Sequence, residues 1–118
     1  MKKVLIIEYD EVLLDVVDYI LIGCGLSVYS FKEIPTMGAI IKIHPHLIII
    51  DHLLKDGLAN KLCLELKGNE VTGNIPVLLV STNTALKNIA GESCADIYLS
   101  KPFDLNDFEK AVGNLLQT

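Results

Sequence analysis

Short apolar runs alternate with longer amphipathic segments along this chain, and the alternation predicts strands that are each followed by a helix. Four short runs predict strands that deliver polar residues near their ends, and the run at residues 46–51 is almost wholly apolar, which is typical of a parallel strand buried on both faces. They span residues 3–8, 46–51, 76–81 and 96–102. A fifth run, residues 26–30, alternates between apolar and polar positions as a half-exposed edge strand does.

The segments between these runs predict five helices. We expect them at residues 11–23, 34–43, 58–67, 85–90 and 105–116. The helix at 85–90 has the weakest signal, because asparagine, glycine and serine in its surroundings have low helix propensity. Five strands alternating with five helices predict an open α/β fold, in which a parallel sheet is covered by helices on both faces.

The helix at residues 11–23 is apolar on most of its circumference, and Asp10 is placed to cap its start. Its spacing predicts a core-facing side that contains Leu13, Val16, Val17, Ile20 and Cys24. Four more apolar residues lie on its other sides: Val12, Leu14, Leu21 and Ile22. Either neighbouring elements cover this helix on most sides, which we favour, or part of it binds a partner.

Length and composition favour one compact domain over residues 1–118. No apolar run reaches the ~18 residues that a membrane-spanning helix needs, and the chain starts directly with a strand. We therefore expect a cytoplasmic protein without a membrane segment or a secretory signal. The net charge of −5, with 10 scattered Lys and Arg residues, argues against direct nucleic-acid binding.

The three cysteines, Cys24, Cys63 and Cys94, have no short spacing to one another. Such a pattern favours free thiols in a reducing compartment over a disulfide or a metal site.

The polar residues at the ends of these four predicted strands carry the candidate chemistry. In chain order they are Glu8, Asp51, Ser81 and Lys101. Ligands of open α/β sheets bind outside the carboxyl ends of the strands. We therefore expect two carboxylates, a hydroxyl and an ammonium group to meet in one small polar site.

With these strand ends, the chain resembles the receiver domain of two-component response regulators over essentially its full length. The motifs that carry the resemblance are Val-Leu-Ile-Ile-Glu, Leu-Ile-Ile-Ile-Asp, Pro-Val-Leu-Leu-Val-Ser and Tyr-Leu-Ser-Lys-Pro-Phe. The resemblance implies the flavodoxin-like (βα)5 fold, a doubly wound five-stranded parallel sheet of order 2-1-3-4-5. It also implies a signalling protein rather than an enzyme.

The resemblance implies a role for each residue of the site. Asp51 would accept a phosphoryl group, and this attack requires the charge on the transferring oxygens to be neutralised. Lys101 would supply the fixed cation, and Ser81 would donate its hydroxyl to a phosphoryl oxygen. Tyr98 would turn inward when Ser81 shifts. The peptide bond between Lys101 and Pro102 would be cis.

The resemblance further implies a Mg2+ ion bound by Glu8, Asp51 and the backbone carbonyl of Leu53. Receivers usually place two adjacent acids after the first strand, but the second position here is Tyr9, whose neutral phenol is a poor ligand for a hard cation. The site has thus lost one charge. Glu8 could coordinate directly, Asp10 could turn inward, or the protein could work without metal. The loop after Asp51 is also two residues shorter than usual.

Two main functions follow from this sequence. In the first, a sensor histidine kinase or a histidine phosphotransfer protein phosphorylates Asp51. The surface of the fourth helix, fifth strand and fifth helix then changes its affinity for an output protein. In the second, a receiver-like module binds partners or forms a homodimer without phosphorylation, as Tyr9 and the short loop suggest. A flavin carrier has little support, because the chain has no glycine-rich phosphate cradle and no tryptophan.

Overall fold

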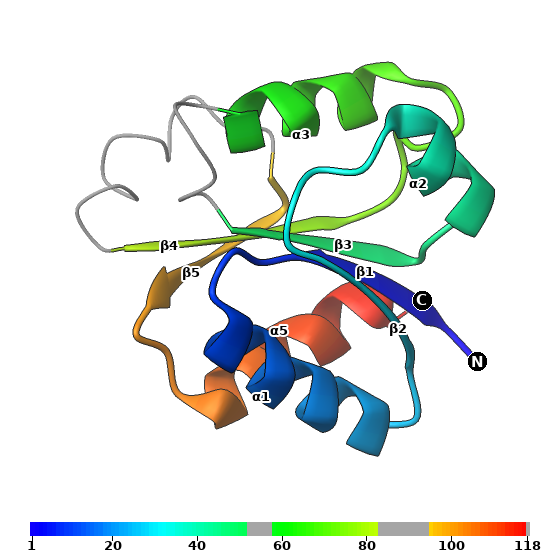
Figure 1. Ribbon diagram of the computed structural model, residues 1–118. Helices are drawn as coiled ribbons and strands as arrows, with labels where there is room; N and C mark the ends of the chain where they lie inside the picture. Colours follow the sequence, from blue (N-terminus) through cyan, green and yellow to red (C-terminus); the bar gives the residue numbers. More distant parts are fainter. Residues whose placement is uncertain (52–57, 83–94, 118) are drawn as a thin grey trace.

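The computed structural model describes residues 1–51, 58–82 and 95–117. Five parallel strands form one sheet in the order β2-β1-β3-β4-β5, with α1 and α5 on one face and α2 and α3 on the other (Figure 1). The elements are β1 Lys3–Ile7, α1 Glu11–Gly23, β2 Ser27–Phe31, α2 Met37–Ile43, β3 Leu47–Asp51, α3 Leu58–Gly68, β4 Val77–Thr82, β5 Ile97–Lys101 and α5 Leu105–Leu116. The predicted fold and strand order are confirmed. The helix expected at 85–90, Leu53 and Cys94 lie outside the described residues.

The central strands are apolar throughout because each of their faces supports a separate core. On β1, Leu5 and Ile7 pack in the core under α2 and α3, whereas Val4 and Ile6 pack in the core under α1 and α5. The strands β3 and β4 divide their side chains in the same way. Successive side chains of a strand point to opposite faces, so a sheet covered on both sides requires continuous apolar runs.

The buried side of α1 differs from the prediction. Leu14, Val17 and Leu21 are buried, whereas Cys24 is exposed and Val16 is 39% exposed. The predicted residues Leu13 and Ile20 are half-buried. The spacing did not fix the inward side, because apolar residues recur at three- and four-residue intervals on more than one side of this helix.

Part of α1 remains uncovered, so the expectation that its neighbours cover it on most sides is wrong. Val12, Tyr19 and Ile22 are 74%, 82% and 61% exposed. Together with Val16 they follow one another at three- and four-residue intervals, which places them in one row along the outward side of the helix. We call these four residues the outer row of α1.

Two helix starts show how local chemistry sets the boundaries. Asp10 caps α1 as expected, since its Oδ1 accepts hydrogen bonds from the backbone N–H groups of Val12 and Leu13 at 3.0 and 3.3 Å. The second helix begins at Met37 rather than at residue 34. Pro35 disfavours helical geometry in the residue before it, and Thr36 then caps the shortened helix.

A polar clamp fixes the amino-terminal ends of β4 and β5 to α3. Lys67 Nζ donates to Asp96 Oδ2 at 2.8 Å and to the carbonyl oxygen of Ile75 at 2.9 Å. The same carboxylate oxygen accepts from the backbone N–H of Val77 at 2.7 Å. One carboxylate therefore holds two donors from separate elements.

Replacing Asp96 with alanine is expected to lower the free energy of unfolding by about 1 kcal/mol, because the Val77 N–H loses its acceptor and the Lys67 ammonium group loses one of its two acceptors. Urea denaturation followed by circular dichroism measures this change. Glu109→Ala, at an exposed position of α5, is the matched control and should change stability by less than half as much. Equal stability of the Asp96 and Glu109 variants would contradict a structural role for the clamp.

Candidate functional site

The predicted site residues lie at the carboxyl ends of four neighbouring strands. Asp51 and Lys101 are the last residues of β3 and β5, Ser81 is the penultimate residue of β4, and Glu8 follows β1 directly. The parallel register aligns these ends, because Asp51 pairs with Val80 in β4. The backbone N–H of Glu8 extends the pairing of β1 with β2 by donating to the carbonyl oxygen of Phe31 at 2.9 Å.

Lys101 joins the two carboxylates. Its Nζ lies 3.1 Å from both carboxylate oxygens of Glu8 and 3.3 Å from Oδ1 of Asp51. The side chains of Glu8, Asp51 and Lys101 are only 5%, 2% and 16% exposed. Because charges removed from water must be paired, this ammonium group is what permits two acids to lie side by side in the protein.

Glu8 binds its proton more tightly than an ordinary glutamate. Burial is the largest cause, followed by a hydrogen bond to Asp51 and by the negative charge of Asp51. The backbone N–H of Asp10, which donates to Glu8 Oε2 at 3.2 Å, and Lys101 act in the opposite direction. The net effect raises the pKa of Glu8 from 4.5 to about 7. Glu8 therefore carries a proton at pH values below about 7.

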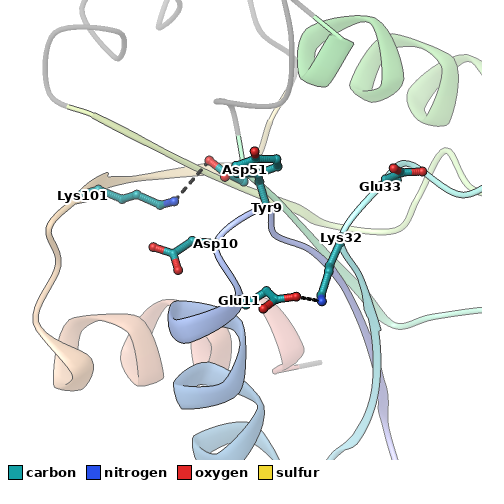
Figure 2. A pocket seen from close by; sticks show the side chains of 7 residues that line it. All are labelled: Tyr9, Asp10, Glu11, Lys32, Glu33, Asp51 and Lys101. Carbon is teal, nitrogen blue, oxygen red and sulfur yellow. Dashed lines mark hydrogen bonds and ion pairs between the residues drawn. The ribbon is translucent and has the colours of Figure 1, made fainter.

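A surface pocket of about 730 Å³ opens onto Asp51 (Figure 2). Its lining comprises Tyr9, Asp10, Glu11, Lys32, Glu33, Asp51 and Lys101. Lys32 and Glu11 form an ion pair on its rim. Tyr9 is 74% exposed, so its phenol lies at the rim and not among the buried acids.

Sequence reasoning did not identify Glu11, Lys32 and Glu33 as site residues. A signal was present: β2 neighbours β1 in a sheet of order 2-1-3-4-5, so the residues that follow β2 must emerge at the same edge as Glu8. Lys32 and Glu33 come directly after β2. They form the rim of the pocket opposite Lys101 in Figure 2.

Asp51 at the floor of the pocket and the buried Glu8 beside it fit a divalent cation. Glu8 and Asp51 are buried and hydrogen-bonded to each other, and a hard cation prefers carboxylate, carbonyl and water oxygens. The Oδ1 atom of Asp10 caps α1. Glu8 is the acid that forms a hydrogen bond with Asp51. Within the described ranges there is no group of three or more His, Cys, Asp or Glu residues that could hold a metal. The side-chain donors are therefore two carboxylates.

The two predicted switch residues occupy different environments. Ser81 is completely buried at the end of β4. Tyr98, in β5, is half-buried and packs against the core under α2 and α3. In the pairing of β4 with β5, Tyr98 lies opposite Leu79, and Leu79 precedes Ser81 by two residues. The Lys101–Pro102 peptide bond is cis, as expected.

Comparisons with known proteins agree with this fold, although no protein-family model matches the chain. The DNA-binding dual master transcriptional regulator RpaA of Synechocystis sp. is 32% identical over 99% of the chain, which covers 50% of that protein. A putative response regulator from Chloroflexus aurantiacus has a TM-score of 0.83 and 26% identity, with 98% of this chain and 97% of that chain covered. The receiver domain of a signal transduction histidine kinase from Syntrophus aciditrophicus has a TM-score of 0.79 and 26% identity, with 98% and 90% covered.

The chain is a response regulator receiver domain. This receiver spans half the length of RpaA, and its match to histidine kinase P4 of Formosa agariphila, 36% identical over 62% of the chain, covers 6% of that kinase. At 17% identity, the fold also matches the receiver domain of a sensor histidine kinase from Pseudomonas aeruginosa, with a TM-score of 0.77 and 99% and 98% of the two chains covered. That domain was solved with a magnesium ion coordinated in its active-site cleft. None of the helices described for this receiver has the length and apolar character that a membrane span requires.

Proposed function

We propose that this receiver accepts a phosphoryl group on Asp51 from a sensor histidine kinase or a histidine phosphotransfer protein. The observation that carries the proposal is the position of Lys101 Nζ, 3.3 Å from Asp51 Oδ1 at the floor of an open pocket. A carboxylate with a fixed cation beside it can attack an anionic phosphoryl group without accumulating unpaired negative charge.

Each residue of the site has a part in this transfer. Asp51 supplies the attacking oxygen, and Lys101 neutralises charge on the carboxylate and on the incoming phosphoryl oxygens. Ser81 donates its hydroxyl to one of these oxygens. Glu8, Asp51 and the carbonyl of Leu53 would hold Mg2+, which when bound supplies positive charge to the phosphoryl oxygens. Burial of Glu8 and Asp51 keeps water from competing for these interactions.

Phosphorylation would add roughly two negative charges at the end of β3. In our proposal Ser81 moves toward the new charge and Tyr98 turns inward, so that the surface formed by the fourth helix, β5 and α5 changes its affinity for an output protein. Residues 1–118 would act as one receiver domain in the cytoplasm, with neither nucleic acid nor membrane as its direct partner.

The acceptor role is tested by intact-mass spectrometry after incubation with acetyl phosphate and Mg2+. We expect one added phosphoryl group on the wild-type protein and none on Asp51→Asn, which keeps the shape of the side chain but removes the nucleophile. The variant must retain the circular dichroism spectrum of the wild type. An equal adduct on the variant would place the acceptor elsewhere, and no adduct on either protein would reject phosphorylation by this donor.

The outer row of α1 favours a second candidate function. Its exposed apolar side chains suit a module that binds a partner or a second copy of itself without phosphorylation. This alternative becomes the better account if acetyl phosphate gives no adduct while sedimentation or pull-down assays detect an interaction that Tyr19→Ser weakens.

A further inference from the structure

We propose that Tyr9 makes the site selective for phosphodonors whose leaving group is a cationic aromatic ring, of which phosphoimidazole is the simplest. This inference rests on the proposed acceptor role of Asp51. It assigns to Tyr9 a function of its own at the position where the family usually has a second acid.

The direction of attack brings the leaving group to the pocket rim. The side chain of Asp51 is only 2% exposed. Among the described residues, the pocket in Figure 2 is the opening through which a phosphodonor can reach its carboxylate. Phosphoryl transfer requires the attacking and leaving atoms to be roughly in line. When Asp51 attacks from the floor of the pocket, the leaving group therefore points outward, to where Tyr9 lies.

The residues of the pocket rim favour a phosphodonor whose leaving group is an aromatic ring with a positive charge. Tyr9 is the one aromatic side chain among the described residues that line the pocket, and its 74% exposure leaves a ring face available for stacking. Among the described residues that line the pocket away from Lys101, the rim carries the carboxylates of Asp10, Glu11 and Glu33, and its ammonium group, Lys32, is paired with Glu11. A cation over an aromatic ring and near excess negative charge is stabilised by both.

Phosphoimidazole meets these requirements with balanced chemistry. Its ring is protonated at the nitrogen that does not carry phosphorus, so the leaving group is cationic before transfer. As the Asp51 carboxylate forms its bond to phosphorus, the P–N bond breaks and its electron pair returns to the ring. Neutral imidazole leaves with the proton it already carried, and Asp51 becomes an acyl phosphate.

The test compares two small donors that both contain a P–N bond, phosphoimidazole and phosphoramidate, of which only the first has a ring. Intact-mass spectrometry gives the rate of Asp51 phosphorylation with each donor in the presence of Mg2+. We expect Tyr9→Ala to lower the rate with phosphoimidazole, divided by the rate with phosphoramidate, by about threefold, which corresponds to the free energy of an exposed cation–π contact. Tyr9→Phe should retain most of the ratio, since it keeps the ring face.

Tyr29→Ala is the matched control, because Tyr29 is an exposed tyrosine on β2 that does not line the pocket. It should leave the ratio unchanged. An unchanged ratio in Tyr9→Ala, with both donors still phosphorylating Asp51, would overturn the role of Tyr9 and leave the acceptor role intact. If neither donor phosphorylates the wild-type protein, the acceptor role of Asp51 fails and the selectivity of Tyr9 fails with it.

Discussion

Replacing Lys101 with methionine is expected to slow phosphorylation of Asp51 by acetyl phosphate on the order of 10²-fold. The variant removes the one side-chain ammonium group that contacts Asp51 and Glu8 in the described structure, so the charge that develops on the phosphoryl oxygens loses its fixed counterion. The rate is measured by intact-mass spectrometry at saturating Mg2+. The same substitution should lower the free energy of unfolding at pH 8 by about 3 kcal/mol, because two buried carboxylates lose their partner.

Lys110→Met controls for the loss of a lysine as such, since Lys110 is exposed on α5. It should change neither the rate nor the stability appreciably. Lys101→Arg retains the charge with a different shape and should fall between the wild type and Lys101→Met in stability. If Lys101→Met is phosphorylated at the wild-type rate, the fixed cation has no part in the transfer.

Replacing Glu8 with glutamine is expected to stabilise the metal-free protein increasingly as pH rises from 5 to 8. The pKa of Glu8 is about 7 in the folded protein and near its ordinary value of 4.5 in the unfolded chain. The folded state therefore binds more protons between these values, and the wild-type protein loses stability as pH rises toward 7 and through it. Glutamine cannot ionise, so the variant avoids this loss, which amounts to about 3 kcal/mol.

The measurement is urea denaturation of both proteins at pH 5, 6, 7 and 8 in the presence of EDTA. The quantity of interest is the difference between their free energies of unfolding at each pH, because other carboxylates affect both proteins alike. Glu109→Gln, at an exposed position, should give a difference that does not vary with pH. A constant difference for Glu8→Gln as well would mean that Glu8 ionises as an ordinary glutamate.

The strand ends were predictable from sequence because they obey two strong rules. A parallel strand between two helical layers must be apolar on both faces, and ligands gather at the carboxyl edge of such a sheet. Glu8, Asp51, Ser81 and Lys101 stand where an apolar run stops, so the topology alone brings them to one edge.

The inward side of α1 was not predictable, because an apolar circumference offers several equivalent sides and only packing against the sheet chooses among them. The choice of Leu14, Val17 and Leu21 leaves the outer row exposed. The raised pKa of Glu8 was also beyond sequence reasoning, since it depends on burial and on the distance to Asp51 in three dimensions. Tyr9, by contrast, was recognised as a departure from the family by its position alone.

The place of β3 in the sheet determines which part of the receiver opens last. All five of its residues are buried, and it pairs with β1 on one side and β4 on the other. Amide hydrogens in such a strand exchange with solvent mainly through global unfolding, whereas those at the sheet edges exchange through smaller local openings. We therefore expect Asp51 to lie in the slowest-exchanging segment, so that any backbone response to its proposed phosphorylation should appear in the elements around β3.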